Sequence, residues 1–372
     1  MNTAEYKPET CVWELTTECN LRCRHCASSC TGEGRKDELS EEEVEKAAEQ
    51  IAALGVKWVS LTGGELFTSK AWYPAAKLLK KRGVHVHMIT NGTLICDNVI
   101  QKIKDADVSM VSVSLDGTKE IHDFIRGDGI YDSAYQGMEK IQKAGIRTGC
   151  ITSVMQQNLS VLKELKEDLI KNRAQRWQIQ MAVPEGNMRL YQDSLLEPAQ
   201  ITELIDMAYE MSLDGRIHII LPDNVGYYTK KEMSLRQYGD RGYRVWKGCN
   251  AGIRSFGILS NGDIVGCTSM RGSMFVEGNL LSRSLKDIWE DPDSFLWRRK
   301  LTKEKLGKKC SGCIYAKMCL GGCSNTRYTV QGSVYSDNPY CAYAAYQDHE
   351  SLNKIMKHEI RRKYWKDNSG SN

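Results

Sequence analysis

The 372-residue sequence has no apolar run long enough to cross a bilayer, because a transmembrane helix needs about 20 consecutive apolar residues. It does not open with the basic-then-apolar pattern of a secretory signal peptide, since the first residues read MNTAEYKPETCVWEL. The formal net charge is only +4, from 51 basic and 47 acidic side chains. This balance gives no indication of nucleic acid or a membrane surface as a partner. We therefore expect a cytoplasmic protein.

Sequence repeats with a period of about 20–50 residues and low-complexity tracts are also missing, which excludes solenoid and array architectures. An apolar content of 41% and a charged content of 26% are ordinary for a globular protein. The chain is long enough to bury a sizeable core, either in several domains or in one large barrel with an appendage.

What the sequence does contain is an unusual number of cysteines, 14 in all. In a reducing compartment so many thiols do not indicate a disulfide framework, and closely spaced sets indicate metal ligands or catalytic thiols. Most of them fall into two clusters, at 11–30 and 249–341, and only Cys96 and Cys150 lie between. Because cysteine is common in protein cores as a small hydrophobe, these two are predicted to be buried structural thiols.

Between the two clusters, short β-rich runs alternate with helical patterns. The predicted strands are 11–16, 57–64, 85–90, 110–117, 146–154 and 176–183. The first predicted helix begins after Ser40, a plausible N-cap, and the others lie near 69–82, 97–104, 131–144, 159–171 and 198–212. Six such strand–helix units imply parallel strands joined by right-handed crossovers.

Glycine and polar residues follow the second, third and fourth predicted strands, as Gly63-Gly64-Glu65, Asn91-Gly92 and Asp116-Gly117. Ligands of parallel α/β folds collect at the carboxyl ends of strands. Because such signals follow nearly every strand, a barrel fits better than a Rossmann sheet. We predict an α/β protein in which an N-terminal extension, 1–10, precedes a partial (β/α)6 TIM-type barrel at 11–215.

The alternation ends near residue 215. A bridging segment, 216–248, has one strand-like run, IHIILP at 217–222. From residue 249 glycines and cysteines dominate and leave little room for an apolar core, so 249–345 is predicted to be a small domain held together by metal. The remainder, 346–372, is predicted to be a charged helix and tail.

Cys19, Cys23 and Cys26 follow the first predicted strand with the spacing C-x3-C-x2-C. A structural zinc site uses four ligands, usually as two close pairs, so these three thiolates leave it incomplete. A cubane iron–sulfur cluster held by three protein thiolates keeps one iron free. An open coordination position is what a metal centre needs to bind and activate a small molecule. The spacing therefore favours an open iron–sulfur cluster over zinc.

This cysteine motif resembles that of the radical S-adenosylmethionine (SAM) superfamily, and so do LTGGE at 61–65, ITNGT at 89–93, SVSLDG at 112–117 and HDFIRG at 122–127. The resemblance implies that the free iron chelates SAM and that one electron cleaves it to a 5′-deoxyadenosyl radical, which abstracts hydrogen. It implies SAM contacts at His25, Gly63, Gly64, Glu65, Asn91, Ser114, Asp116 and Arg126. Cys30 is expected to stay outside the cluster as a free thiol near the barrel mouth.

The second cysteine set comprises Cys249, Cys267, Cys310, Cys313, Cys319, Cys323 and Cys341. A zinc ribbon explains only four of them. Their spacing resembles the signature of the SPASM domain, an auxiliary-cluster extension of radical SAM enzymes. The resemblance implies a distal cluster on Cys310, Cys313, Cys319 and Cys341, and a proximal one on Cys249, Cys267 and Cys323. With the SAM cluster this makes three 4Fe-4S clusters. An open iron, a non-thiolate ligand, Cys11 or Cys30 are alternatives for the proximal cluster's fourth position.

The resemblance implies an oxidoreductase that abstracts hydrogen from a ribosomally made peptide and forms a thioether or C–C crosslink. The implied partners are a peptide or small protein substrate and a flavodoxin- or ferredoxin-type electron donor. Because little chain precedes Cys19, three alternatives are open for the leader peptide: a separate leader-peptide recognition protein, direct binding by the barrel rim, or a substrate without a leader. No nucleic-acid or membrane partner is expected.

Three alternatives remain open. One is a radical SAM enzyme that modifies haem or tetrapyrrole side chains. Another is an anaerobic sulfatase-maturing enzyme, which is disfavoured because Thr268 follows Cys267 where that family places an aspartate. The last is a non-enzymatic, zinc-stabilised binding module.

Overall fold

The computed structural model describes residues 6–236 and 246–347. Its central element is one sheet of ten strands in the order β10-β9-β8-β1-β2-β3-β4-β5-β6-β7. The strands are β1 Thr10–Glu14, β2 Trp58–Thr62, β3 His85–Thr90, β4 Met110–Ser114, β5 Thr148–Val154, β6 Arg176–Met181, β7 His218–Ile220, β8 Ser255–Ile258, β9 Asp263–Val265 and β10 Val276–Asn279. Neighbours from β8 through β1 to β7 pair in parallel, and β9 and β10 are antiparallel additions.

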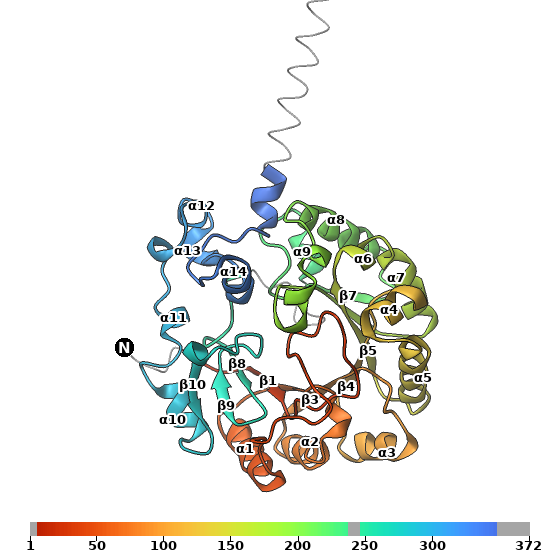
Figure 1. The fold of residues 1–372 in the computed structure, drawn as a ribbon. Helices are drawn as coiled ribbons and strands as arrows, with labels where there is room; N and C mark the ends of the chain where they lie inside the picture. Colours follow the sequence, from red (N-terminus) through yellow and green to blue (C-terminus); the bar gives the residue numbers. More distant parts are fainter. Residues whose placement is uncertain (1–5, 237–245, 348–372) are drawn as a thin grey trace, which may run out of the picture.

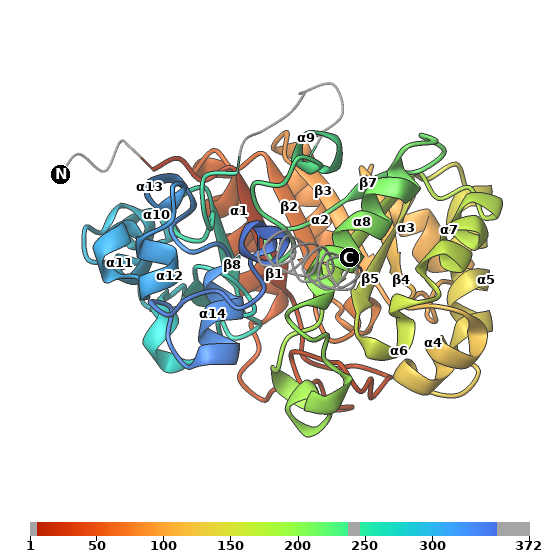
Figure 2. The ribbon, with the colours of Figure 1, turned by 90° about the horizontal axis from the view of Figure 1, so that it is seen from above.

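The helices lie outside this curved sheet, which forms an incomplete ring in Figure 1. The barrel helices are α1 Glu41–Ala53, α2 Trp72–Lys81, α3 Asp97–Asp105, α4 Lys119–Arg126, α5 Ile130–Lys143, α6 Gln156–Leu159, α7 Leu162–Lys171, α8 Gln200–Ser212 and α9 Glu232–Leu235. The C-terminal helices are α10 Leu285–Glu290, α11 Leu296–Arg299, α12 Lys308–Ser311, α13 Ala316–Cys319 and α14 Ser324–Gln331. They gather at the β8 edge, on the opposite side from α4, α5 and α7 (Figure 2).

The predicted partial barrel is confirmed, and each predicted strand is present with ends within a few residues. The sheet extends further than the six predicted units, because the run at 217–222 contributes β7 and the C-terminal region contributes β8 beside β1. The predicted cap of the first helix is also present: Ser40 and Glu43 form a reciprocal capping box at the start of α1. The predicted C-terminal helix and tail lie outside the described residues from residue 348 onward.

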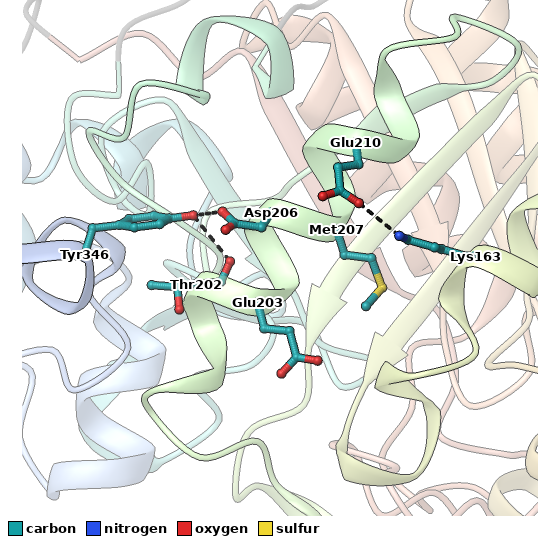
Figure 3. Close-up of a pocket in the computed structure, with 7 residues that line it drawn as sticks. All are labelled: Lys163, Thr202, Glu203, Asp206, Met207, Glu210 and Tyr346. Carbon is teal, nitrogen blue, oxygen red and sulfur yellow. Dashed lines mark hydrogen bonds and ion pairs between the residues drawn. The ribbon is translucent and has the colours of Figure 1, made fainter. Parts of the chain in front are cut away.

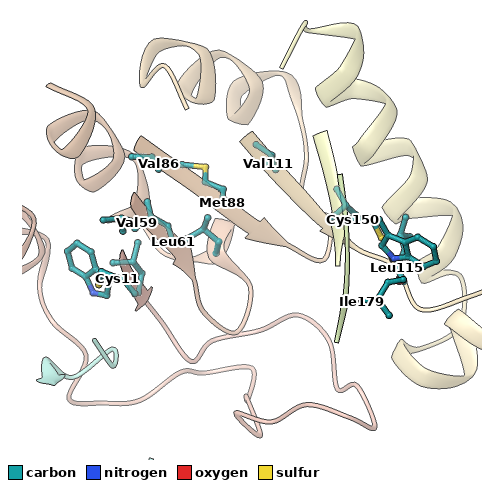
Figure 4. Packing of buried hydrophobic residues seen from close by; sticks show 14 of the residues in the cluster. Cys11, Val59, Leu61, Val86, Met88, Val111, Leu115, Cys150 and Ile179 are labelled. Atoms are coloured by element: carbon teal, nitrogen blue, oxygen red, sulfur yellow. Dashed lines mark hydrogen bonds between the residues drawn. The ribbon is translucent and has the colours of Figure 1, made fainter. Parts of the chain in front are cut away.

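Residues alternate between the two faces of the sheet, as the two-residue period of a strand requires. The outward face is apolar and packs against the helices; it includes Cys11, Val59, Leu61, Val86 and Met88 (Figure 4). The inward face carries several polar side chains, among them Ser60, His87 and Gln178. As a result, the barrel interior is hollow and holds a cavity of about 1570 Å³.

The two isolated cysteines have different environments. Cys150 is buried on β5 and its thiol contacts the Leu115 carbonyl, as the prediction of a structural thiol requires. The prediction is wrong for Cys96, which is exposed immediately before α3. Helix α3 buries Ile100 and Ile103 instead, so its first turn and the residue before it face solvent. Among the described residues, no helix is long and apolar enough to cross a membrane.

Candidate active site

The loop after β1 brings Cys19, Cys23, Cys26 and Cys30 into one small cluster. A turn closes between Cys23 and Cys26, where the N–H of Cys26 donates to the carbonyl of Cys23 over 3.3 Å. The N–H of Cys19 donates to the Thr31 carbonyl over 2.7 Å, which folds the two ends of the loop together. Three of the four thiols are buried and Cys26 is partly exposed.

The thiols of this loop interact through their charges. Burial raises the pKa of Cys19 to about 11, and Cys23 and Cys26 contribute to the rise. A hydrogen bond from the Cys30 thiol lowers the pKa of Cys26 to about 5, while the same bond raises the pKa of Cys30. Cys30 thus lies beside Cys26 as a donor. Three thiols gathered on one loop fit the chemistry of an iron–sulfur site, because a bound cluster would stabilise them as thiolates.

Asp116, after β4, is the centre of a buried polar network. Its Oδ2 accepts from Arg126 Nε over 2.6 Å and lies 2.8 Å from His25 Nε2, and its Oδ1 accepts from the Ser153 N–H over 3.0 Å. Burial raises the pKa of Asp116, but Arg126 and His25 outweigh burial and hold it well below its usual range. Arg126 also reaches to 3.9 Å from Cys23 Sγ. Three residues predicted to contact SAM, His25, Asp116 and Arg126, therefore form one hydrogen-bonded network beside the cysteine loop.

Glu65, after β2, ties the neighbouring loops together. The buried carboxylate accepts from Thr90 Oγ1 over 2.6 Å and from the Asn91 N–H over 2.7 Å. The Asn91 side chain in turn donates to Asn20 Oδ1, in the cysteine loop, over 2.9 Å. Ser114 is half-buried at the end of β4. The carboxyl ends of β1 to β4 thus meet at one edge, as the sequence predicted.

The Gly63-Gly64 pair allows the loops after β1 and β2 to touch through their backbones. The Gly64 N–H donates to the Thr16 carbonyl over 2.7 Å and the Glu65 N–H to the Glu18 carbonyl over 2.8 Å. A Cβ on Gly63 would lie 2.7 Å from the Thr16 oxygen, and one on Gly64 only 2.2 Å from the Glu18 oxygen. Only glycine fits this approach.

Gly64→Ala is therefore expected to lower the free energy of unfolding by about 2–3 kcal/mol, because backbone must move to admit the methyl group. Urea unfolding under anaerobic conditions measures the loss. The control is Gly272→Ala, where φ is −63° and the nearest atom is 3.7 Å from the added Cβ; it should change stability by less than about 0.5 kcal/mol. Equal stability of both variants would contradict the steric argument.

The loop after β6 also covers the cysteines, a feature that the sequence analysis missed. Asn187 donates through its N–H to the Cys26 carbonyl over 2.9 Å and through Nδ2 to the Cys23 carbonyl over 3.0 Å. A Cβ on Gly186 would lie 2.2 Å from the Cys26 oxygen. The available signal was a Gly-Asn pair shortly after a predicted barrel strand.

The C-terminal cysteines fall into two groups according to which thiols influence one another. Burial raises the pKa of Cys323 to about 12, and Cys249 and Cys267 raise it further. Burial likewise raises the pKa of Cys319 to about 12, with further increases from Cys341 and Cys310. Cys313 joins the second group through its influence on Cys341. This division parallels the proximal and distal sets that the family resemblance implies.

Neither alternative cysteine for the proximal fourth position joins the proximal set. Cys11 is buried in the apolar core between sheet and helices, and Cys30 lies beside Cys26. Over residues 6–236 and 246–347 the fold does not surround any single point with three Cys, His, Asp or Glu side chains. It brings the thiols into neighbouring positions without arranging them around a metal position.

Unpaired donors around the C-terminal cysteines fit anionic clusters. Hydrogen bonds from Trp246 and Thr326 lower the pKa values of Cys319 and Cys323, so these two buried donors face thiols of the C-terminal set. The buried amide nitrogen of Asn338 and two nitrogens of Arg327 have no hydrogen-bond partner among the described residues. Because buried donors are nearly always satisfied, these atoms indicate acceptors other than protein groups, such as cluster sulfurs.

The barrel cavity reaches this region, since Cys249 lines it. Its lining is strongly cationic, with Lys57, Arg147, Arg176, Arg236, Lys247, Arg254 and Arg298 against the acids Glu9 and Asp223. Arg254 pairs with Glu9, and Arg236 with Glu232. Lys57, Arg147 and Lys247 make no ion pair with any described residue. The cavity therefore suits a ligand that carries several negative charges.

Histidines complete the lining at His85, His87 and His218. His87 lies 3.2 Å through Nδ1 from Ser60 Oγ and 2.8 Å through Nε2 from Ser112 Oγ. Burial lowers its pKa to about 3, so its ring is neutral at physiological pH and both nitrogens are occupied. We assign it a structural role in shaping the cavity.

A second cavity, of about 480 Å³, lies over α8 (Figure 3). Lys163 pairs there with Glu210 over 2.9 Å, and the Tyr346 hydroxyl donates to Asp206. None of the residues that line it is a cysteine. It marks the place where the C-terminal segment packs on the barrel.

Taken together, the structure shows a partial (β/α) barrel with a three-cysteine loop at the carboxyl end of β1. Comparison with known families agrees: residues 13–169 match the Radical SAM superfamily, and residues 249–314 match the iron–sulfur cluster-binding SPASM domain. The chain belongs to the radical SAM enzymes that carry a SPASM domain. It is an enzyme of radical chemistry that uses SAM and iron–sulfur clusters.

Relatives of the chain include a heme synthase and a mycofactocin maturase. The AdoMet-dependent heme synthase of Methanosarcina barkeri is 28% identical over 345 residues, which cover 90% of this chain and 97% of that protein. The mycofactocin maturase MftC of Mycolicibacterium smegmatis is 26% identical and covers 90% of this chain and 82% of its own. The solved structure of Streptococcus suis SuiB bound to precursor peptide SuiA has a TM-score of 0.72 at 18% identity, and covers 89% of this chain and 75% of its own. The similarity to SuiB shows a shared fold and nothing more.

Proposed function

We propose that this enzyme oxidises carboxylate-bearing side chains of a tetrapyrrole held in the barrel cavity. The observation that carries the proposal is the excess of lysine and arginine around a cavity of about 1570 Å³ that extends to Cys249. A tetrapyrrole with several propionates has the matching charge. The similarity to a heme synthase over nearly its whole length supports the same substrate class.

The proposed reaction converts a propionate into a vinyl group. When bound, SAM and its cluster would supply the radical chemistry that removes one hydrogen atom from the carbon next to the ring. The products would be a vinyl group and carbon dioxide, and the one remaining electron would need an oxidised acceptor, which an auxiliary cluster held by the C-terminal cysteines would supply. In this proposal Cys19, Cys23 and Cys26 hold the SAM cluster, and the two C-terminal cysteine groups hold two further 4Fe-4S clusters. Lys57 and Arg147 are exposed and directly precede β2 and β5, at the end of the barrel away from the cysteine loop. In this proposal they anchor carboxylates at that end, and the reacting side chain extends through the barrel towards the cysteine loop.

Iron coproporphyrin III tests the proposal. The wild-type enzyme should bind it, seen as a change in its visible spectrum, and release carbon dioxide with SAM and dithionite. Lys57→Ala combined with Arg147→Ala should raise Kd at least tenfold, because each hydrogen bond to a charged group contributes about 1.5–3 kcal/mol. Lys163→Ala, which removes an exposed cation over α8, is the control and should leave Kd unchanged. Wild-type protein that binds no tetrapyrrole would rule the proposal out.

Peptide crosslinking is the second candidate. The observation in its favour is the three-thiol proximal group, which neither Cys11 nor Cys30 joins. An open iron there offers a site for a substrate thiolate, and the similarity to a mycofactocin maturase is consistent with a peptide. A leader-recognition protein and a flavodoxin- or ferredoxin-type donor would then be partners. Mössbauer spectra with and without a cysteine-containing peptide test it: a four-thiolate signature that the peptide leaves unchanged speaks against an open iron.

A further inference from the structure

Arg327 is a buried cation that forms no ion pair with a carboxylate of residues 6–236 or 246–347. It lies on α14, one turn after Cys323, and its relative exposure is 0%. Nη2 donates to Ser324 Oγ over 3.2 Å, but Nε and Nη1 have no hydrogen-bond partner among the described residues. A buried guanidinium is unfavourable unless its charge and its donors are both satisfied. Nε and Nη1 therefore remain available to an anionic acceptor, which no carboxylate among the described residues supplies.

The position of Arg327, one turn after Cys323, and the charges that act on it point to the cluster cysteines. Burial lowers the pKa of Arg327, and the groups that oppose this are Cys249, Cys310, Cys323 and Tyr227. None of these is a carboxylate. Cys249 and Cys323 belong to the proximal group, whereas Cys310 belongs to the distal group. The cation thus lies within the electrostatic reach of both.

The glycine turn directly before α14 restricts the position of the Arg327 guanidinium. Gly321 and Gly322 both have left-handed conformations, with φ of +81° and +73°. A Cβ on Gly321 would lie 2.7 Å from Arg327 Nη1. The turn that joins Cys319 of the distal group to Cys323 of the proximal group therefore wraps over the guanidinium, which limits the directions in which it can point.

We propose that Arg327 is the shared counter-ion of the two auxiliary iron–sulfur clusters, donating through Nε and Nη1 to their thiolate or sulfide sulfurs. It acts as a positioning residue: it holds the clusters' reduction potentials high and touches no substrate. Reduction adds negative charge to a cluster, so a nearby cation stabilises the reduced form. An oxidised auxiliary cluster is then a better acceptor for the electron that a substrate radical gives up.

Redox titration of the full-length, iron-loaded protein, followed by electron paramagnetic resonance without substrate, tests this role. Arg327→Met and Arg327→Gln should each make reduction of the auxiliary clusters at least tenfold less favourable, which equals 59 mV for one electron. Arg327→Lys keeps the charge and should change the equilibrium constant for reduction of the auxiliary clusters by less than about threefold. The SAM cluster, recognised by its response to added SAM, should keep its potential in every variant. Tyr328→Phe is the matched control, since Tyr328 lies next on α14 and packs against Phe275.

Wild-type auxiliary potentials in the Met and Gln variants, with full iron content, would overturn the proposal. Loss of auxiliary iron in these two variants but not in Arg327→Lys would support it, because charge is what separates them. Loss of iron in all three variants would overturn it in favour of a packing role. Because no tetrapyrrole or peptide is added, the result does not depend on the proposed substrate.

Discussion

Replacing Cys19, Cys23 and Cys26 together by alanine should abolish formation of 5′-deoxyadenosine from SAM. The three thiols lie on one loop, interact through their charges and include Cys23, which Arg126 approaches to 3.9 Å. Without them no cluster can deliver the electron that cleaves the sulfonium bond. Chromatography of reactions with dithionite and SAM measures the loss, and iron analysis should show that the C-terminal iron remains.

Cys30→Ala is the matched control, because Cys30 belongs to the same buried cluster of thiols. It should retain 5′-deoxyadenosine formation if it only donates a hydrogen bond to Cys26. Cys96→Ala, at the exposed cysteine before α3, should behave as wild type. Turnover that persists in the triple variant, or a Cys30 variant as inactive as the triple one, would refute the assignment of the three-cysteine loop.

Asp116→Ala is expected to cost about 3–5 kcal/mol of unfolding free energy, because it leaves the buried Arg126 guanidinium without its carboxylate. Arg126 Nε lies 2.6 Å from Asp116 Oδ2, and the carboxylate side chain is 0% exposed. Urea unfolding at neutral pH measures the loss. The control is Asp105→Ala: the Asp105–Lys77 pair is about half exposed, so its loss should cost less than about 1 kcal/mol.

The same carboxylate predicts an acid dependence. The pKa of Asp116 is held well below its usual range, so its contribution is complete above the unfolded-state pKa near 4 and declines as pH falls towards the folded-state value. Wild-type stability should therefore fall more steeply below about pH 5 than that of Asp116→Ala. Parallel acid profiles for the two proteins would show that the carboxylate is not ionised within this network.

The sequence predicted those features that repeat over short distances. Strand–helix alternation predicted a parallel barrel, Ser40 predicted the start of α1, and cysteine spacing predicted the two cluster regions. The sequence also contains a signal for the cavity inside the barrel. His85 and His87 in HVHMIT, and Arg176 and Gln178 in RWQIQM, alternate with apolar residues and line the cavity. The sequence analysis did not use this alternation.

Other features arise only when distant segments meet. The pairing of β8 with β1 joins residues more than 240 positions apart. The contact of His25 with Asp116 spans 91 positions, and no local pattern encodes it. Arg327 reads in the sequence as an ordinary charge in a short helix, and its complete burial follows from packing against Gly321 and its neighbours.

By itself, then, the sequence determined the barrel, the family and the cysteines that lie close together, because period and spacing act over a few residues. Tertiary structure decided which charged side chains are buried, which thiols are exposed and where the barrel encloses a cavity. Burial depends on all the elements packed around a side chain, and those elements come from the whole length of the chain. For Cys96 and Arg327, residue type alone favoured the opposite environment.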